Sequence, residues 1–469
     1  MRKDRKQQKN KTSQLNLFNR LGETPVENTI SGIGKGSTAG EELISLLERE
    51  RTLTTDIMER IVEHVNLKKA FHQVVGNQGA SGVDGVDIEG FRQWYGKGIN
   101  PLREALLSET YKVSPVLKVE IPKASGGTRV LGIPTVKDRF IQQAIHQELN
   151  KHYEPYFSES SFGFRPGRGA HQAIEQAVKY IKEGKEWVVD IDLENFFDRI
   201  NHDRLMQRIS KRIGDKRLLR LVKAYLTAGM MEGGLTSQRT AGTPQGGPLS
   251  PLLSNIVLDE LDKELERRGH NFCRYADDCN IYVRSRKAGE RVMQTIVKFI
   301  EQKLKLKVNR LKSGVRHCSE VKFLGYTIMS GGGIRVADKS IERLKDNVRT
   351  ITRRNRGVKF EQIIKELNLL LTGWGNYFQL ANCWLGVYRD LDAWIRRKLR
   401  CYRLKQCGRK YTIYKLLRSL GRKESESWNV VMYSQGWWNM SKKVAVNHAM
   451  NINWFRQLGL QSLNTMNAG

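Results

Sequence analysis

The sequence predicts an α+β fold, and three observations support this class over a doubly wound α/β sheet. Short apolar stretches with strand character lie in the middle of the chain, mostly in pairs around a turn. Strands and helices do not alternate in the regular β-α-β series that a parallel sheet requires. The C-terminal part reads mainly as helix, and no internal repeat is visible. A chain of 469 residues with 39% apolar residues is long enough for two to four packed domains.

Helices are predicted where apolar residues recur every three or four positions. The first spans residues 41–75, in which Met58, Ile61, Val62 and Val65 share one face. Three glycines in "NQGASGVDGVD" then end the helical pattern. Further helices are predicted, in chain order, over residues 99–111, 137–157, 202–229, 252–269, 289–306 and 341–356.

Strands are predicted as two hairpins and several short single strands. The first hairpin spans residues 117–134 around the glycine turn of "KASGGT", and the second spans residues 272–283. A short apolar strand, "WVVDIDL", covers residues 187–193. Two more short strands are expected over residues 321–328 and 333–337.

The composition indicates an anionic partner. The formal net charge is +31 and the sequence pI is about 9.9, an excess that costs self-repulsion unless a partner neutralises it. Nucleic acid is the first candidate, and an anionic membrane surface is the second. No run of 18 apolar residues predicts a membrane span, and no apolar stretch of a secretory signal follows the basic N-terminus. The six cysteines form no CxxC pair, so a structural zinc site is not predicted, and their scatter fits a reducing compartment.

The positive charge is concentrated toward the C-terminus. Residues 339–423 hold 22 Lys and Arg against 6 Asp and Glu, which is about half of the net charge in under a fifth of the chain. Aromatic residues are interspersed among these cations. Because cations meet phosphates and rings meet bases, this mixture is typical of nucleic-acid binding. The rings alone would rather indicate an ordinary core, but the excess of charge would not.

The stretch "FCRYADDCNIYV" places Asp277 and Asp278 side by side between two strand-like runs. Asp disfavours strands, and adjacent carboxylates repel each other, so either a turn or a metal site must explain them. The strand over residues 187–193 carries Asp190 and Asp192 on one face, because strand residues two apart point the same way. If this strand pairs beside the hairpin, Asp192 meets Asp277 and Asp278, and clustered carboxylate oxygens suit Mg²⁺.

Each of these carboxylate patterns has a simpler interpretation when it stands alone. Two adjacent aspartates are more often a turn, and an Asp-x-Asp pair is more often a feature of an edge strand. Their combination in a strongly basic chain favours a two-metal phosphoryl-transfer site, in which two Mg²⁺ ions ~3.5–4 Å apart hold the attacking and leaving oxygens.

These motifs together resemble the reverse transcriptase/maturase proteins of group II introns. "YADD" resembles the catalytic hairpin of reverse transcriptases, and "DLENFFD" resembles their first aspartate motif. "TPQGGPLSPLLSNIVLDELD" is similar to the nucleotide-pocket and helix motif, while "IPKASGGTRVLGIPTVKDR" and "SFGFRPGRGAHQAI" are similar to fingers motifs. "LKLKVNRLKS" and "FLGY" resemble the motifs that close the palm, and "LTGWGNYF" resembles the maturase-specific thumb. The motifs occur in the family's order from about residue 41 to the C-terminus.

The resemblance implies an active site for RNA-directed DNA synthesis. Asp192, Asp277 and Asp278 would be the catalytic carboxylates that hold two Mg²⁺ ions. Lys123 and Arg129, on the fingers hairpin, would hold the triphosphate of an incoming dNTP, as a point charge and a planar fork respectively.

Further roles follow from the same resemblance. Phe197 would lie beneath the sugar and exclude a 2′-hydroxyl, and Gln245 would line the nucleotide pocket. Lys312 matches a possible proton donor to pyrophosphate, with an ordinary solvated lysine as the equal alternative. Arg165 and Arg168, in "SFGFRPGRG", would contact phosphates of the template.

The helix predicted over residues 341–356 has a basic side. Its apolar residues recur at helical spacing and its cations fall largely off that stripe. Arg349, Arg353 and Arg354 are therefore expected to contact an RNA backbone.

The fold implied by the resemblance is a right-hand polymerase with fingers and palm, an α-helical thumb and a small basic C-terminal domain. The predicted division is a disordered basic tail and linker, an N-terminal extension of the fingers, fingers and palm, a maturase thumb, and a DNA-binding-like region, over residues 1–40, 41–100, 101–335, 336–410 and 411–469. Many relatives end in an endonuclease with paired CxxC motifs. Cys401 and Cys407 are too widely spaced for that pattern, and "SQGWWNMSKKVAVNHAM" resembles the tail of relatives that lack the nuclease.

The implied function is RNA-directed DNA polymerisation combined with binding of the encoding intron RNA to promote splicing and retrohoming. The implied partners are group II intron RNA, an RNA template, a DNA primer or target, and dNTPs, with no membrane and a monomeric or homodimeric state. The implied location is the bacterial cytoplasm, in association with the nucleoid or a ribonucleoprotein. Two alternatives stay open: a non-catalytic RNA-binding splicing factor, and a domesticated reverse transcriptase in host defence or repair.

Overall fold

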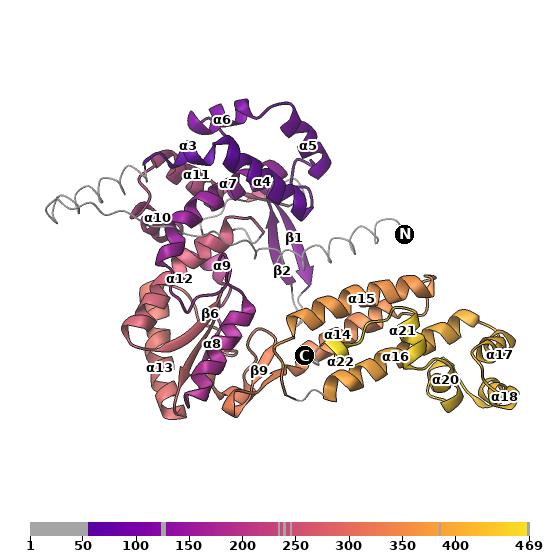
Figure 1. Cartoon of the computed structure of the whole chain (residues 1–469). Helices are drawn as coiled ribbons and strands as arrows, with labels where there is room; N and C mark the ends of the chain where they lie inside the picture. The colour runs from indigo at the N-terminus through magenta and orange to yellow at the C-terminus, as the bar shows by residue number, and fades with distance from the viewer. Residues whose placement is uncertain are drawn as a thin grey trace, which may run out of the picture. The chain divides into compact units, whose positions relative to one another are not determined.

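The structure is a computed structural model that divides into two compact units (Figure 1). It describes residues 55–122, 128–232, 235–237, 241–243, 246–383 and 386–466. Unit 1 consists of Met1–Ala177 and Trp187–Arg316, and unit 2 consists of Val178–Glu186 and His317–Gly469. Each unit is therefore assembled from two separate pieces of the chain. The predicted division into five parts stays a prediction, and its first part, residues 1–40, lies outside the described residues.

Unit 1 combines helices with two sheets, so the predicted α+β class is confirmed. Its helical elements are α3 (Ile57–Ile61), α4 (His64–Asn77), α5 (Ile88–Gly96), α6 (Asn100–Leu107), α7 (Val136–Tyr153), η1 (Glu154–Tyr156), α8 (Ala170–Lys182, which continues into unit 2), α9 (Phe196–Arg199), α10 (His202–Ser210), α11 (Lys216–Thr227), α12 (Ser250–Arg267), α13 (Arg286–Phe299) and η2 (Ile300–Leu304).

One sheet of unit 1 has the strand order β2-β1-β4-β5, and the other has the order β6-β7-β3-β8. The strands are β1 (Val116–Pro122), β2 (Thr128–Ile133), β3 (Trp187–Ile191), β4 (Met230–Glu232), β5 (Leu235–Ser237), β6 (Asn271–Tyr275), β7 (Asp278–Val283) and β8 (Gly314–His317). The pairs β1–β2 and β6–β7 are antiparallel, as predicted for the two hairpins. In the second sheet β3 pairs with β7, so a strand distant in sequence lies directly beside the second hairpin.

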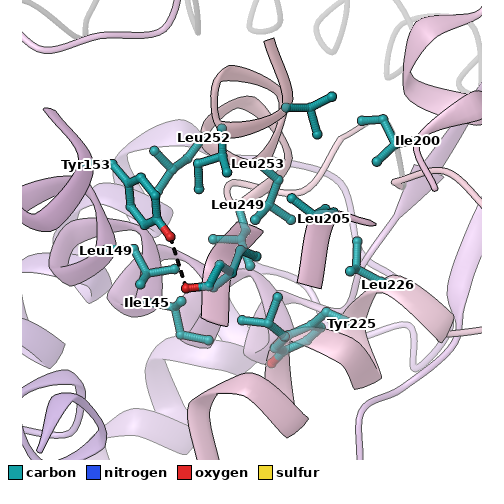
Figure 2. Packing of buried hydrophobic residues seen from close by; sticks show 14 of the residues in the cluster. Ile145, Leu149, Tyr153, Ile200, Leu205, Tyr225, Leu226, Leu249, Leu252 and Leu253 are labelled. Atoms are coloured by element: carbon teal, nitrogen blue, oxygen red, sulfur yellow. Dashed lines mark hydrogen bonds between the residues drawn. The ribbon is translucent and has the colours of Figure 1, made fainter. Parts of the chain in front are cut away.

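A large part of the apolar core of unit 1 lies among four helices. Figure 2 shows side chains of α7, α10, α11 and α12 directed toward one another, including Leu149, Leu205, Leu226 and Leu253. All four are buried, with at most 2% of their surface exposed. Helix α13 packs on the β6-β7-β3-β8 sheet. It approaches the sheet closely at Gly289, because glycine has no side chain to hold the helix away.

Several helices of unit 1 begin where a side chain accepts a hydrogen bond from the first turn. Thr135 accepts from the amide of Asp138 at the start of α7, and Asn201 accepts from the amide of Arg204 at the start of α10. Asp215 caps α11 and splits the helix predicted over residues 202–229 into α10 and α11. The buried Asp215 carboxylate also accepts from the amide of Met58, so the break is tied to α3.

The structure corrects the apolar face predicted near the start of the described chain. Met58, Ile61 and Val62 are buried, but Val65 is 79% exposed. The predicted single helix is interrupted between α3 and α4, where Glu63 adopts an extended ψ of 141°. The interruption changes the phase of the helix, so the fourth position of the stripe turns outward.

Unit 2 is mainly helical, with one small sheet in which β9 (Tyr326–Ile328) and β10 (Ile334–Val336) pair antiparallel. Its helical elements are η3 (Cys318–Glu320), η4 (Ser330–Gly332), α14 (Asp338–Ile351), α15 (Phe360–Tyr377), α16 (Gly386–Cys407), α17 (Lys410–Ser419), α18 (Glu424–Tyr433), α19 (Trp437–Met440), α20 (Val444–Ala449), α21 (Ile452–Gln457) and α22 (Leu463–Met466). Among the helices that the structure describes, none is both long and apolar enough to cross a membrane.

Unit 2 includes the end of α8 and the residues that follow it, a short segment from early in the chain. The Glu186 carbonyl accepts a hydrogen bond from the amide of Cys318 at 2.8 Å, and its side chain accepts from the amide of Gly331 at 3.2 Å. Gly332 lies so close to Lys182 and Val178 that a Cβ there would collide with both side chains. The nine residues Val178–Glu186 are thus an integral part of a unit whose other residues follow much later in the sequence.

Candidate active site and nucleic-acid surface

The "YADD" sequence forms the tight turn between β6 and β7. Tyr275 pairs with Asp278, so Ala276 and Asp277 are the two residues at the tip. Ala276 has φ of 57°, a left-handed backbone conformation that residues other than glycine rarely adopt. The turn therefore projects Asp277 and starts β7 with Asp278.

The register of β3 brings a third carboxylate to this turn. Ile191 lies opposite Cys279 at the end of the antiparallel pairing between β3 and β7. Continuing the register by one residue places Asp192 beside Asp278. The backbone carbonyl of Asp192 accepts a hydrogen bond from the amide of Asn309 at 2.9 Å, which fixes the end of the strand. The predicted juxtaposition of the strand over residues 187–193 with the hairpin thus occurs.

The carboxylates of this site influence one another electrostatically. Crowding by protein atoms, together with the negative charges of Asp277, Asp190 and Asp192, raises the pKa of Asp278 to about 7, although much of its side chain faces solvent. Burial also raises the pKa of Asp277, and the charge of Arg129 opposes that rise. Arg129, on β2, therefore acts electrostatically on the tip of the hairpin, where an incoming nucleotide triphosphate is expected.

Two cations already contact the acidic strand. Lys312 Nζ lies 3.4 Å from Asp192 Oδ2, and Arg316 Nη1 lies 3.0 Å from Asp190 Oδ2. Within the described part of the chain, no three His, Cys, Asp or Glu side chains are close enough together to hold a metal ion. The donor chemistry nevertheless fits Mg²⁺, because hard oxygens that raise one another's pKa are stabilised by a divalent cation.

The nucleotide-pocket residues are only partly within the described structure. Lys123 and Gln245 lie outside the described residues. Phe197 is half-buried at the edge of the core, and its carbonyl accepts a hydrogen bond from the amide of Thr243 at 2.7 Å. A Cβ on Gly246, which has φ of 133°, would come within 2.9 Å of the Gly132 carbonyl in β2. Thr243 thus contacts the Phe197 turn, and Gly246 approaches the fingers hairpin.

The structure does not favour Arg165 as a template contact. Its guanidinium is buried, donates to the carbonyls of Ser158 and Ser161, and pairs with Glu154 at 2.8 Å. This side chain stabilises its own loop and has no donor directed to solvent. Arg168 is nearer the surface and pairs with Glu159, so its predicted contact with a template phosphate stays a prediction.

The sequence does not indicate the role of Arg316, which pairs with Asp190. The two residues are 126 positions apart, and nothing in the local sequence around Arg316 marks it as a partner of the acidic strand. Only the adjacency of β8 and β3 in the sheet brings them together.

Unit 2 presents a separate group of cations and tryptophans, here named the basic aromatic patch. The patch consists of Arg349, Arg354, Trp394, Arg397, Lys398 and Trp438. The Arg397 guanidinium lies 3.8 Å from the centre of the Trp438 ring, and Lys398 lies 4.9 Å from it. Burial and then the charges of Arg349, Arg354 and Arg397 lower the pKa of Lys398, which shows that positive charges crowd here.

The helix that carries Arg349 is shorter than predicted. It ends at Ile351, with Thr352 as its C-cap, whereas the apolar spacing predicted a helix to residue 356. The Leu344 and Val348 side chains of the predicted stripe are buried. Arg353 and Arg354 therefore follow the helix in an exposed connection instead of lining its side.

Two family models match the chain, one on each side of residue 330. Residues 121–328 match the model described as "Reverse transcriptase (RNA-dependent DNA polymerase)". Residues 341–421 match the model described as "Group II intron, maturase-specific domain". The two matches contain, respectively, the carboxylate site and most of the basic aromatic patch.

Curated relatives agree with these models. Protein YkfC of Escherichia coli is 32% identical over 304 residues, which cover 56% of this chain and 80% of that protein. The group II intron-encoded protein LtrA of Lactococcus lactis is 31% identical over 327 residues, covering 55% of this chain and 54% of LtrA. The putative COX1/OXI3 intron 2 protein of Saccharomyces cerevisiae is 29% identical, covering 62% of this chain and 41% of that protein. The matched part thus spans about half the length of LtrA and less of the yeast protein.

Proposed function

Because this chain belongs to the family of group II intron reverse transcriptases and maturases, we propose that it extends a DNA primer along an RNA template and binds its intron RNA to promote splicing. The observation that carries the catalytic part is the pairing of β3 with β7, which sets Asp192 beside the Asp277–Asp278 turn. A scaffold that only bound RNA would have no need to keep mutually repelling carboxylates at the end of a sheet.

The residues of unit 1 divide the work of nucleotide addition between them. Asp192, Asp277 and Asp278 would hold two Mg²⁺ ions, which when bound supply positive charge to the attacking and leaving oxygens. Arg129 would orient the triphosphate, because a guanidinium fork matches phosphate oxygens. The Lys312 ammonium group contacts Asp192 and would bind a phosphate group of the nucleotide in place of this carboxylate.

The basic aromatic patch supports the RNA-binding part of the proposal. Its cations are crowded and the Trp438 ring is partly exposed, so the patch can meet both a phosphate backbone and unpaired bases. Intron RNA is the expected ligand, since the patch lies mainly in the part of the chain that matches the maturase-specific model. The bacterial cytoplasm, with RNA and target DNA in reach, is the proposed location.

The proposed function is tested by primer extension on an RNA template in Mg²⁺. Asp277→Asn should reduce extension to background, because the change removes one of the negative charges that would bind the metal cations. Asp203→Asn, an exposed carboxylate on α10, is the matched control and should extend like the unaltered protein.

RNA binding measured on the same preparations separates the alternatives. Asp277→Asn should bind RNA within about twofold of the unaltered protein, because the basic aromatic patch is in the other unit. Extension by Asp277→Asn at the unaltered rate would refute the active-site assignment. An unaltered protein that binds intron RNA but extends no primer would instead be a non-catalytic splicing factor. One that extends primers without promoting splicing would be a domesticated polymerase.

A further inference from the structure

A buried arginine next to the catalytic turn makes an unusually complete set of hydrogen bonds. Arg274, on β6, has no exposed surface, and it precedes Ala276 and Asp277 by two and three residues. Its Nε and Nη2 donate to the two carboxylate oxygens of Asp262 at 2.7 and 2.5 Å. This bidentate pair joins β6 to α12, and both side chains are fully buried.

The remaining donors of the same guanidinium reach three other groups. Nη2 also donates to Ser161 Oγ at 2.7 Å, and Nη1 donates to Asn255 Oδ1 at 3.0 Å. Nη1 donates in addition to the carbonyl of Ala276 at 2.8 Å. Each of the five N–H groups of the guanidinium therefore has an acceptor, and one acceptor belongs to the turn itself.

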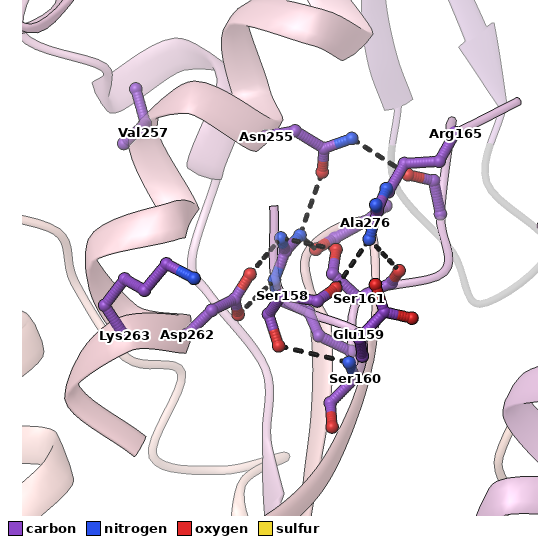
Figure 3. Close-up of polar contacts among 12 residues, drawn as sticks. Ser158, Glu159, Ser160, Ser161, Arg165, Asn255, Val257, Asp262, Lys263 and Ala276 are labelled. Atoms are coloured by element: carbon purple, nitrogen blue, oxygen red, sulfur yellow. Dashed lines mark hydrogen bonds and ion pairs between the residues drawn. The ribbon is translucent and has the colours of Figure 1, made fainter. Parts of the chain in front are cut away.

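Two of the acceptors and Gly163 also lie close to the turn. Figure 3 shows Asn255, Ser161 and Asp262 gathered beside Ala276. Asn255 Nδ2 donates to the Gly163 carbonyl at 2.9 Å, so Asn255 connects Arg274 with Gly163. Gly163 lies so close to the turn that a Cβ there would be 2.2 Å from the Ala276 amide nitrogen, a distance that only glycine permits.

The backbone of Arg274 is held as firmly as its side chain. Its amide donates to the Ser160 carbonyl and its carbonyl accepts from the Phe162 amide, both at 2.9 Å. Residues 160–162 thus extend the sheet beyond β6 through a parallel bridge between Ser161 and Arg274. The position of the guanidinium is consequently fixed. Through its hydrogen bond to the Ala276 carbonyl, the guanidinium can hold the turn in place.

A buried ion pair of this kind needs an explanation other than stability. Replacing a buried pair by apolar residues of similar volume is often neutral or stabilising, because desolvation of both charges offsets their attraction. The Ala276 backbone, in contrast, is in a conformation that alanine disfavours and that must be imposed by its surroundings.

We propose that Arg274, held by Asp262 and Asn255, is a positioning residue that fixes the left-handed conformation of Ala276 and so sets the carboxylates of Asp277 and Asp278 for metal binding and polymerisation. This inference rests on the proposed function, since it assigns the geometry of that same site. The inference assigns a positioning role to residues of three motifs, "SFGF", "NIVLDELD" and "RYADD". These residues hold the turn in its conformation without contacting a substrate.

The test replaces the whole pair, because Arg274→Met alone leaves a buried unpaired carboxylate and is expected to destabilise the fold. In the double variant Arg274→Met/Asp262→Leu, thermal unfolding and RNA affinity should stay close to those of the unaltered protein. The kcat of primer extension should fall about 100-fold, since a displacement of reacting groups by about 1 Å has an effect of this order. The Mg²⁺ concentration for half-maximal extension should rise.

A readout independent of activity is the affinity for Mn²⁺, measured by electron paramagnetic resonance on protein without nucleic acid. We expect Mn²⁺ to bind at least about tenfold more weakly to the double variant. The matched control is Arg208→Ala/Glu260→Ala, which removes an ion pair between α10 and α12 away from the turn and should leave Mn²⁺ binding and kcat unchanged.

Two further variants separate positioning from a merely structural role. Arg274→Lys keeps the charge opposite Asp262 but loses the planar fork, so it should retain the fold and still lose kcat. Ala276→Gly, added to Arg274→Lys, should restore part of the lost kcat, because glycine adopts the turn conformation unaided.

The proposal is overturned if the folded double variant, or Arg274→Lys, binds Mn²⁺ and extends primers like the unaltered protein. Failure of the proposed function looks different: the unaltered protein then extends no primer, while the Mn²⁺ comparison still reports on the turn.

Discussion

Asp278 is held in the folded chain at a pKa of about 7, well above the ~3.9 of an unfolded aspartate. Between these two values the folded state binds more protons than the unfolded state. The contribution of Asp278 to the free energy of unfolding of the metal-free protein therefore falls as the pH rises from about 4 to about 7. The reason is that ionised Asp278 is partly desolvated and faces the charges of Asp277, Asp190 and Asp192, with Lys312 as the opposing cation.

The prediction is checked by thermal unfolding in EDTA for the unaltered protein and Asp278→Asn. The variant should gain stability relative to the unaltered protein as the pH is raised from 4.5 to 8, because its amide never ionises. Titrating groups remote from Asp278 are common to both proteins and cancel in the comparison. A difference between the two melting temperatures that is the same at both pH values would contradict the assignment.

Phe197 is expected to select deoxyribose over ribose. Its half-buried ring contacts Phe196 at 5.3 Å between centroids, and its backbone holds the loop at Thr243. Phe197→Ala should raise the ratio of rNTP to dNTP incorporation at least about tenfold, since steric exclusion of one small group corresponds to ~1–3 kcal/mol. Phe299→Ala, another half-buried phenylalanine of unit 1, should leave the ratio unchanged. An unaltered ratio in Phe197→Ala would assign the ring to the core alone.

Individual residues were predictable only where a local pattern marked them. The carboxylates of Asp192, Asp277 and Asp278 stand in short motifs whose spacing already suggests proximity. Arg165 is buried and paired, whereas an arginine among glycines looks exposed in sequence, because in three dimensions its loop folds around it. Arg274 carries no sequence pattern that sets it apart from other cations, and its partner Asp262 is on a different element.

At the scale of single elements, α14 and the connection after it make the clearest test of the RNA surface. All three arginines are exposed, but Arg349 also pairs with Asp346 at 2.5 Å and lies against the ring of Trp394. Replacing Arg349, Arg353 and Arg354 with Ala should weaken RNA binding and make its salt dependence shallower by roughly 1–2 units on a log–log plot, since fewer counterions are released. Most of this change should come from Arg353 and Arg354, because Arg349 is already paired with Asp346.

The control for that variant carries the same loss of charge elsewhere. Lys287, Arg291 and Lys298 are exposed on α13 in unit 1, and their triple replacement with Ala should leave RNA affinity and slope nearly unchanged. Affinity is measured over a salt series for all three proteins. Equal losses in both variants would mean that net charge, and not the basic aromatic patch, governs binding.

Elements were predicted well where a local periodicity decides them and less well where a distant contact does. The two hairpins follow from alternating residues around a turn, and both form. The breaks between α3 and α4 and between α10 and α11 were missed. The second break is fixed by Asp215, whose carboxylate bonds to Met58 more than 150 residues earlier, and no local pattern contains that contact.

For the whole molecule, the sequence predicted the α+β class and the concentration of charge, because both are sums over many residues. It did not predict that the chain crosses between the two units and returns. Val178–Glu186 looks like the end of an ordinary helix, and its membership of unit 2 depends on contacts with Cys318, Gly331 and Gly332. Such contacts join residues far apart in sequence and leave no local signal.

The crossing of the chain sets an order of events during synthesis. Val178–Glu186 leaves the ribosome before the 130 or so residues of Trp187–Arg316, and only then do its partners in unit 2 emerge. At ~5–20 residues per second, this segment waits roughly 7–26 s without them. Unit 1 can therefore close before the residues that contact this segment in unit 2 have been made.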